Sequence, residues 1–280
     1  MNDTSDTLLK LWFDTMRLNH SYVAFAHPPK VQESATIVQK PIVVDVNKID
    51  HLDNVKPIKH SIIIHKALEL ETDPADPFVQ NARQLADKIT TLDDLYATLK
   101  DFHGCSLKQT ATNTVIFDGT SEADVMLIGE APGSQEDEKG IPFCGDSGKL
   151  LDLILQSIGL SRKQNIYITN TIFWRPPANR RPTDLEVAIC RPFLEKHISL
   201  IKPKLLILVG STALTALLGQ EKQITKVRTQ YYEYTNKYLK VPLTATAIFH
   251  PAYLLRQPMK KKDTWFDMLS IKKFLNSQQQ

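Results

Sequence analysis

The 280-residue chain lacks any run of 18 or more apolar residues, so we expect no transmembrane helix. Its first residues, MNDTSDTLLKLW, hold no basic segment ahead of an apolar stretch, so we also expect no secretory signal peptide. The three cysteines, Cys105, Cys144 and Cys190, are too few and too scattered for a disulfide framework. A reducing environment, the cytoplasm, is therefore the expected location. With 42% hydrophobic and 23% charged residues, the composition is typical of a globular protein.

The chain also lacks a large excess of either charge, since its net charge is only +3. The basic and acidic residues are nevertheless unevenly distributed along the chain. Residues 1–100 carry 11 basic against 14 acidic side chains, whereas residues 101–280 carry 23 against 17. The surplus of positive charge favours an anionic partner for the C-terminal part. An ordinary solvated basic surface explains the charge equally well.

The first hundred residues show little regular pattern and are interpreted as an N-terminal extension. Residues 6–18 have apolar side chains at helical spacing, and residues 79–100 resume such a pattern. Between them, residues 27–78 mix proline, lysine and aspartate with one short apolar run, which indicates a linker or a poorly ordered arm. We therefore divide the chain into an extension, 1–100, and a catalytic domain, 101–280.

Regular alternation of strands and helices begins in the second part of the chain. Four short runs rich in β-branched residues predict strands at 125–130, 166–170, 205–210 and 245–250. Helical patterns follow them at 147–160, 184–201, 211–219 and 263–276. Near-continuous apolar strands that alternate with helices predict an α/β fold, a three-layer α/β/α sandwich around a central, mostly parallel four-stranded sheet.

Chemically useful side chains follow three of the four predicted strands. The first strand ends in Glu130, the second in Asn170 and the fourth in His250, while the third ends in Gly210. Ligands of open α/β sheets bind at the carboxyl ends of the strands, so these side chains should share one crevice. A single polar residue at a strand end is usually only a turn or a helix cap. A carboxylate, a carboxamide and an imidazole together favour a site.

These groups suit the hydrolysis of a bond to a planar heterocycle. The amide of Asn170 has a donor and an acceptor in one plane and can read the edge of a nucleobase. A neutral His250 can donate to a developing oxyanion, and the Glu130 carboxylate can hold a water molecule. Phe143, in the proline-flanked loop GIPFCG, can stack on a planar ring, or it can fill the core under that loop.

Three motifs carry a resemblance to a known family. GEAPGSQEDEKGIPFCGDSGKLLD, YITNTIFWRPPANRRPT and HPAYLLRQP, in this order, resemble the uracil-DNA glycosylase superfamily, and most closely its family-4 bacterial and archaeal type. The resemblance covers residues 101–275. It implies a DNA repair enzyme that removes uracil from DNA and leaves an abasic site. We expect this enzyme to be a monomer with no membrane partner.

The resemblance also implies a role for each site residue. Glu130 would position the attacking water, and Phe143 would stack on the flipped uracil. Asn170 would bind the N3–H and O4 edge of the base, and His250 would donate to O2 as the base leaves. The further substrate-binding candidates are Gly129 and Glu136, the latter with a solvated loop charge as its other reading.

Two stretches are candidates for gripping DNA. The stiff RPPANRR loop supplies arginines, and the stretch after His250 supplies an apolar pair that could wedge into the base stack, followed by Lys260–Lys262 to meet phosphates. The lysine triplet is equally compatible with a solvated helix flank. The candidate DNA-binding residues are Arg175, Arg180, Arg181, Leu254, Leu255 and Arg256.

Relatives of the family-4 type usually bind a [4Fe–4S] cluster through four cysteines. Only two of the corresponding positions are cysteine in this chain, Cys105 and Cys190, while Phe102 and Trp174 occupy the other two. Such clusters need four thiolates, so we expect neither this cofactor nor another, with aromatic packing in its volume. Cys105 and Cys190 would act as ligands only if a cluster were present.

Three other readings remain. The PFCGDSG segment resembles that of family-5 glycosylases, which act on a wider range of deaminated bases, so broader base specificity is open. A non-catalytic module that binds uracil or DNA is a second alternative, although Glu130, Asn170 and His250 together favour catalysis. A nucleotide-phosphate site is disfavoured, because GEAPGS has neither the GxGxxG spacing nor a Walker lysine.

Overall fold

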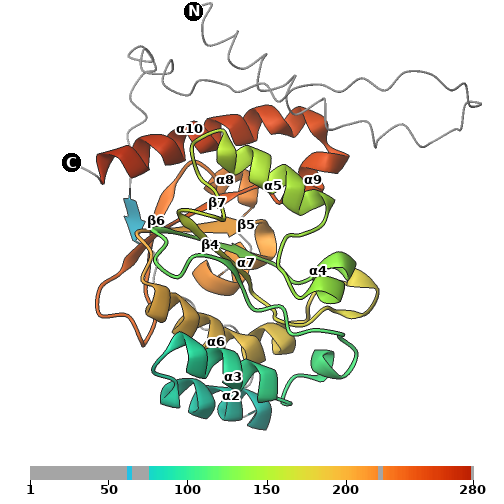
Figure 1. Cartoon of the computed structure of the whole chain (residues 1–280). Helices are drawn as coiled ribbons and strands as arrows, with labels where there is room; N and C mark the ends of the chain where they lie inside the picture. Colours follow the sequence, from blue (N-terminus) through green and yellow to red (C-terminus); the bar gives the residue numbers. More distant parts are fainter. Residues whose placement is uncertain (1–61, 65–75, 220–222, 279–280) are drawn as a thin grey trace, which may run out of the picture. The chain divides into compact units, whose positions relative to one another are not determined.

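Strands and helices alternate along the second half of the chain in the computed structural model, as the sequence pattern predicts (Figure 1). The structure describes three stretches of chain, residues 62–64, 76–219 and 223–278. All of them belong to one compact unit, His60–Gln280. The helix predicted at 6–18 and most of the arm predicted at 27–78 lie outside the described residues.

Four parallel strands form the centre of the sheet, in the order β7-β5-β3-β4. They are β3 (Val125–Gly129), β4 (Ile166–Asn170), β5 (Leu205–Val209) and β7 (Leu243–Ile248). Every residue of β3, β4 and β5 is buried, which explains their near-continuous apolar sequences. The predicted α/β class and its four parallel strands are confirmed.

The sheet is wider than predicted, because the described residues add three outer strands, two beside β7 and one beside β4, and bring the total to seven. β1 (Ile62–Ile64) pairs in parallel with β6 (Tyr231–Tyr234), β6 pairs antiparallel with β7, and β2 (Asp118–Gly119) pairs antiparallel with β4. These strands have two to four residues, too few to show a periodic pattern in sequence.

Helices cover both faces of the sheet (Figure 1). On one face lie α5 (Asp146–Gln156), α9 (Pro251–Arg256) and α10 (Lys261–Ser277). On the other lie α6 (Asp184–Ile201) and α7 (Ser211–Leu218). The capping box of Thr183 and Glu186 starts α6 at the predicted residue. The short helices α4 (Ser134–Lys139) and α8 (Ile224–Val227) were not predicted.

The stretch predicted as one helix at 79–100 consists of two helices that pack against α6 (Figure 1). They are α2 (Pro77–Lys88) and α3 (Leu92–Asp101). The break follows from a new capping box, in which Asp94 accepts from the backbone N–H groups of Thr90 and Thr91. The domain boundary at residue 100 stays a prediction. None of the described helices combines the length and the apolar character needed to cross a membrane.

A chain of buried polar contacts connects α3 with the sheet and α6. The hydroxyl groups of Tyr96 and Tyr167 lie 2.6 Å apart, and the Tyr167 hydroxyl lies 2.6 Å from Nε2 of His197. His197 is fully buried, and burial lowers its pKa to about 3. Its ring therefore stays neutral at every pH at which the protein is expected to work.

Candidate functional site

A cavity of about 790 Å³ lies at the carboxyl ends of the central strands. It is lined by residues that follow β3, β4, β5 and β7, as expected for an open α/β sheet. The fold therefore brings together side chains from motifs that are far apart in sequence, from Glu130 to Arg256. The predicted site residues among its lining are Glu130, Glu136, Phe143, Asn170, Arg180, His250 and Arg256.

Glu130 directly follows β3, and its carboxylate accepts a hydrogen bond from the neighbouring helix α7. Thr212, a buried residue in the first turn of α7, donates its hydroxyl to Oε2 of Glu130 at 2.5 Å. Backbone pairing continues past the strand end, because the Ile172 N–H donates to the Glu130 carbonyl at 3.1 Å. One carboxylate oxygen thus has a fixed partner, and the carboxylate as a whole lines the cavity.

Asn170 lies at the end of β4, directly opposite Gly129 at the end of β3. Its side chain lines the cavity, and the residue is only 2% exposed. A Cβ atom on Gly129 would lie 2.4 Å from Oδ1 of Asn170 and 2.5 Å from Cζ of Phe143. Because Gly129 has no side chain, it leaves the space in which Asn170 and Phe143 approach each other. A contact between Gly129 and substrate stays a prediction.

The ring of Phe143 forms a wall of the cavity rather than a plug beneath the loop. It is 6% exposed, and its centroid lies 5.7 Å from that of the His250 ring, at an interplanar angle of 31°. A planar ligand that lies against the Phe143 face is therefore within reach of the imidazole.

His250 caps the N-terminus of α9, and this contact determines its tautomer. Nδ1 accepts a hydrogen bond from the Ala252 N–H at 3.2 Å, so the proton of the neutral ring resides on Nε2. Burial lowers the pKa of His250, while the nearby Glu130 carboxylate opposes this shift. Gly210, with φ of 94°, permits the close approach, since a Cβ there would lie 3.1 Å from Cβ of His250.

Glu136 is buried and organises the loop that carries Phe143. Its Oε2 accepts from the Gly133 N–H at 3.1 Å, and its Oε1 accepts from the Gly145 N–H at 2.9 Å. The reading of Glu136 as a solvated loop charge is therefore wrong. Both oxygens bind backbone groups of the substrate loop, the name used below for residues 129–148. A direct contact between Glu136 and substrate stays a prediction.

The arginines of the RPPANRR loop differ in how firmly they are held. Arg180 makes two hydrogen bonds to the carboxylate of Glu186, at 2.6 and 2.9 Å, and also lines the cavity. Arg175 donates from Nε to Oδ1 of Asn179 at 2.7 Å. Arg181 is exposed. Glu186 thus orients Arg180, and DNA binding by all three arginines stays a prediction.

The apolar wedge predicted after His250 is wrong for Leu254. This residue is fully buried, because the turn of α9 directs it toward the core. Leu255 is half-buried, whereas Arg256 is exposed and lines the cavity. Met259, in the short 3-10 helix η4 (Pro258–Lys260), is 76% exposed and is the apolar side chain of this stretch that is available to a partner.

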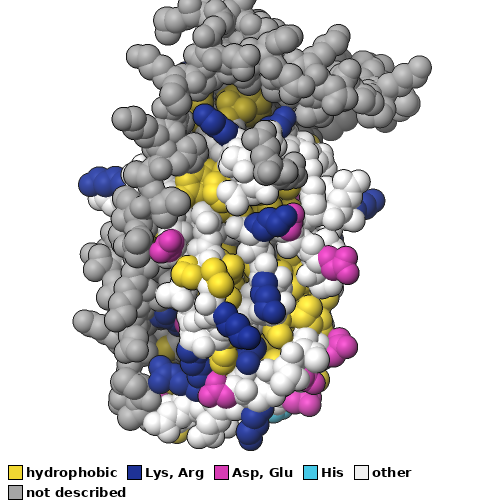
Figure 2. Space-filling view, turned by 90° about the vertical axis from the view of Figure 1, so that its left-hand side faces the viewer, with side chains coloured by type: hydrophobic (Ala, Val, Ile, Leu, Met, Phe, Trp, Pro, Cys, Tyr) yellow, Lys and Arg dark blue, Asp and Glu magenta, His cyan; other side chains and the backbone are white. Residues whose placement is uncertain are grey.

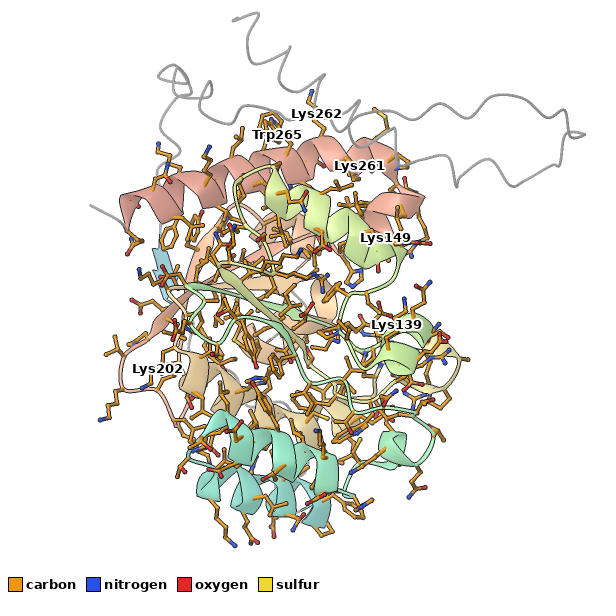
Figure 3. All side chains as sticks on the ribbon, in the orientation of Figure 1. Lys139, Lys149, Lys202, Lys261, Lys262 and Trp265 are labelled. Atoms are coloured by element: carbon orange, nitrogen blue, oxygen red, sulfur yellow. The ribbon has the colours of Figure 1, made fainter. Side chains whose placement is uncertain are left out.

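The predicted lysine triplet is divided by the start of α10. Lys261 is buried, and burial lowers its pKa to about 8. Lys260 pairs with Asp263 at 3.0 Å, and Lys262 points outward from the helix (Figure 3). On the face shown in Figure 2, Lys and Arg side chains form several separate groups with carboxylates between them. The basic surplus on that face is therefore dispersed.

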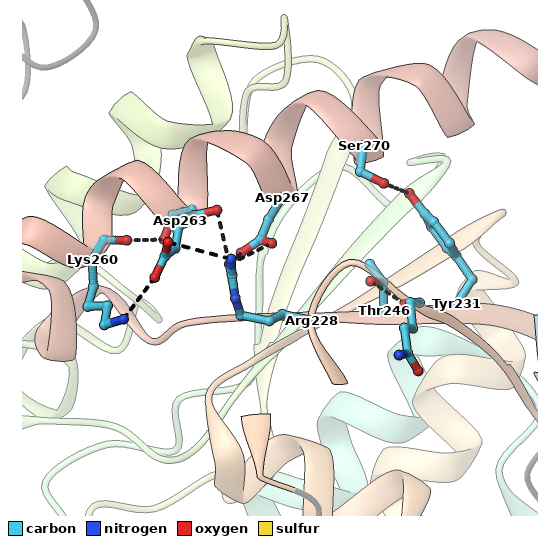
Figure 4. A network of polar contacts seen from close by, with 9 residues as sticks. Arg228, Tyr231, Thr246, Lys260, Asp263, Asp267 and Ser270 are labelled. Atoms are coloured by element: carbon cyan, nitrogen blue, oxygen red, sulfur yellow. Dashed lines mark hydrogen bonds and ion pairs between the residues drawn. The ribbon is translucent and has the colours of Figure 1, made fainter. Parts of the chain in front are cut away.

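The wall of the cavity next to His250 includes Phe249 and Tyr253, which were not predicted. The guanidinium of Arg228 lies 5.0 Å from the centroid of the Phe249 ring. Its NH1 donates to both carboxylate oxygens of Asp267, at 2.9 and 3.0 Å, and to the Asp263 carbonyl at 3.0 Å (Figure 4). Arg228 thus connects this wall to α10. Asp263 and Asp267 lie 35 and 39 residues from Arg228 in sequence, so local patterns gave no signal for these contacts.

The residues at the expected cluster position do not fit a [4Fe–4S] cluster, which needs four thiolates. Cys105 and Cys190 are fully buried and hydrogen-bonded to each other, and burial raises the pKa of Cys190, which keeps this thiol protonated. Phe102 packs 6.1 Å from the ring of Trp174 and 4.9 Å from that of Phe193. Among the described residues, no three His, Cys, Asp or Glu side chains are grouped to hold a metal ion.

Comparison with known proteins agrees with this geometry. The family model of the Uracil DNA glycosylase superfamily matches residues 117–270, more than half of the chain. The chain belongs to this superfamily.

Its curated relatives narrow the class further. The chain is 36% identical to the type-4 uracil-DNA glycosylase of Archaeoglobus fulgidus over 185 residues, which are 65% of this chain and 92% of that protein. It is 37% identical to the type-4 uracil-DNA glycosylase of Thermotoga maritima over 159 residues, 56% of this chain and 80% of that protein. The resemblance to the family-4 type is therefore confirmed.

Proposed function

We propose that this chain is a DNA repair glycosylase that hydrolyses the N-glycosidic bond between uracil and deoxyribose and leaves an abasic site. One observation carries the proposal. An aromatic wall, a carboxamide, a neutral imidazole and a carboxylate from three separate segments line one cavity, in a chain of the uracil-DNA glycosylase superfamily.

Recognition of uracil begins with its removal from the base stack, which costs a few kcal/mol. The free base then lies against Phe143, with its edge toward Asn170. The amide oxygen of Asn170 accepts from N3–H, and the amide nitrogen donates to O4. Cytosine presents an acceptor at N3 and an amino group at C4, so it would face the wrong groups of the same amide.

His250 supplies the main catalytic interaction. As the glycosidic bond lengthens, negative charge develops on O2 of the leaving uracil, and the sugar acquires oxocarbenium character. The neutral ring donates from Nε2 to that oxygen, because Nδ1 is occupied by the Ala252 N–H. A single donor to a developing oxyanion is typically worth roughly 2.7–4 kcal/mol. The lowered pKa keeps the ring in this neutral form at neutral pH.

Glu130 completes the reaction by holding the water that attacks the sugar. Thr212 binds one carboxylate oxygen, which leaves the other to orient a water molecule beside the glycosidic bond. The nearby carboxylate also favours the positive charge that develops on the sugar. Arg256 and Arg181, at the exposed rim, are suited to contact the phosphates on either side of the flipped nucleotide.

A labelled oligonucleotide with one uracil tests this function. The protein is incubated with it, and the product is treated with alkali, which cleaves at abasic sites. We expect cleavage at the uracil position by the wild-type protein and a strongly reduced rate for Asn170→Ala. A parallel oligonucleotide with hypoxanthine measures whether the cavity accepts other deaminated bases. Absence of cleavage beside an active reference glycosylase would refute the proposal.

We further propose that the enzyme needs no iron–sulfur cluster, that it acts as a monomer, and that it works in the cytoplasm. Its support is the donor set at the expected cluster position, where Cys105 and Cys190 are the two thiols and the packed aromatic rings of Phe102 and Trp174 occupy the other two positions. Anaerobically purified protein should contain no stoichiometric iron and should show no broad absorption near 400 nm. Iron at four atoms per chain together with such a band would refute this part, and light scattering tests the monomer.

A further inference from the structure

Phe143 has an unusual backbone for a large side chain. Its φ of 51° lies in the left-handed region, where Cβ is crowded by the neighbouring peptide group. Non-glycine residues keep this conformation only where the surrounding structure holds them in it. Because the Phe143 ring is a wall of the cavity, the group that holds this backbone also determines where a base can stack.

Arg162, in the turn between α5 and β4, binds this segment directly. NH1 donates to the Pro142 carbonyl at 2.7 Å, and NH2 donates to the Phe143 carbonyl at 2.5 Å. Two carboxylates fix the guanidinium in turn. Nε donates to Oδ1 of Asp152 at 2.7 Å, and NH1 donates to Oδ2 of Asp118 at 2.9 Å.

The carbonyl of Phe143 is also enclosed from the other side. A Cβ on Gly148, in the first turn of α5, would lie only 1.7 Å from the Phe143 oxygen. Helix α5 is therefore packed against this carbonyl, and Arg162 binds it. The guanidinium has five donors in one plane and can serve carbonyls and carboxylates together, whereas a lysine ammonium is a single point charge.

We propose that Arg162 is a positioning residue for uracil excision. By binding the carbonyl oxygens of Pro142 and Phe143, it holds the Phe143 ring as the wall against which the flipped base stacks. Arg162 does not line the cavity, so it acts through Phe143 and not on the substrate. This role rests on the proposed function, but the contacts that support it are independent of the residues that react.

The first test compares Arg162→Gln with wild type in single-turnover excision of uracil. We expect the rate to fall at least tenfold and inhibition by free uracil to weaken by a similar factor. Affinity for DNA with a tetrahydrofuran abasic analogue should change less than twofold, because that DNA has no base to stack. Arg162→Lys should recover only part of the loss, since it keeps the charge without the planar fork.

Arg191 provides a matched control. Its side chain is 14% exposed, against 15% for Arg162, and its Nε binds Glu195 within α6 at 2.7 Å. Arg191→Gln removes a comparable ion pair away from the cavity, so it should leave the rate and the uracil inhibition unchanged. If Arg191→Gln and Arg162→Gln lowered the excision rate equally, the effect would be general destabilisation, and the proposal would be overturned.

A double mutant separates positioning from other effects. In protein that already carries Phe143→Ala, adding Arg162→Gln should lower the rate no further, whereas additive losses would contradict action through Phe143. Hydrogen exchange gives a readout that does not require activity. Backbone amides of residues 140–148 should exchange faster in Arg162→Gln than in Arg191→Gln or wild type.

These readouts keep the two proposals distinguishable. If wild-type protein excises no uracil, the proposed function fails, and the exchange of residues 140–148 still decides whether Arg162 holds the loop. Unchanged exchange overturns the role of Arg162 even in an active enzyme. If Arg162→Gln does not fold, Arg162→Lys carries the same comparisons.

Discussion

Two regions of the molecule, the substrate loop and a buried aromatic cluster, are held in place by different forces. The substrate loop is held by directed hydrogen bonds, in which Glu136 accepts from backbone N–H groups and Arg162 donates to backbone carbonyls. The aromatic cluster, defined here as Phe102, Phe173, Trp174 and Phe193, is held by apolar packing. A loop that must present one ring face to a base needs directional contacts, whereas a structural support needs only filled volume.

The comparison predicts that the aromatic cluster controls stability more than activity. Trp174 is 1% exposed, and its Nε1 donates to Oγ1 of Thr114 at 3.0 Å. Trp174→Ala should lower the free energy of unfolding by about 3–5 kcal/mol, measured by urea denaturation. Trp174→Phe should recover most of the loss. A loss below about 1 kcal/mol for the alanine variant would show that the cluster is not a structural support.

At the cavity we expect the reverse, a larger effect of mutation on the excision rate than on stability. His250→Ala removes the donor to the leaving base, so the single-turnover rate should fall about 10²- to 10³-fold. The midpoint of urea unfolding should move little by comparison, since His250 contributes mainly one cap contact to a short helix. A variant that lost stability and kept its rate would reverse the comparison and exclude the proposed role of His250.

Low pH should lower the free energy of unfolding through His197, which is buried on α6. Its folded-state pKa of about 3 lies below the ordinary value of 6.5, so between these values the unfolded chain binds a proton that the folded protein excludes. Stability is therefore lost as pH falls, by about 2 kcal/mol from this group between pH 6.5 and pH 5. His197→Gln should flatten the pH dependence of unfolding in this window, and the exposed His103→Gln should not. Equal slopes in all three proteins would contradict the assignment.

The smallest effect is expected from Thr212, which orients the Glu130 carboxylate. Thr212→Val keeps the shape and removes the hydroxyl, which should lower the rate about tenfold, roughly the 1.5 kcal/mol of a hydrogen bond to a charged group. KM should stay close to that of wild type, because the contact concerns the water and not the base. Thr212→Ser is the matched control and should retain most of the rate. Full activity in the valine variant would show that Thr212 does not contribute to the reaction.

Most of the fold could be predicted from local patterns. The four central strands stand out because both of their faces are buried, and α6 begins at Asp184, as its helical pattern predicts. The break between α2 and α3 falls in TTLDDL, whose threonines and following acidic residue are a local N-cap signal, and there Asp94 accepts from the residues before it. The three outer strands, β1, β2 and β6, were missed because they are short and are defined by their neighbours in the sheet.

The site could be predicted in part, for a similar reason. Glu130, Asn170 and His250 follow strands, and the carboxyl ends of parallel strands meet at one edge. Thr212 and Arg162 have no such signal, because their partners become neighbours only when the sheet order and the packing of α5 are known. Leu254 was misassigned because its sequence position suggests exposure, while the helical turn directs it inward.

The sequence by itself determined the order of strands and helices and the set of reactive side chains, since burial and periodicity are recorded in consecutive residues. Only the tertiary structure decided which nitrogen of His250 carries the proton, which oxygen of Glu130 is engaged and what holds the ring of Phe143. These properties depend on hydrogen bonds whose geometry is determined by packing, and for Glu130 and Phe143 the partners are 82 and 19 residues away in sequence.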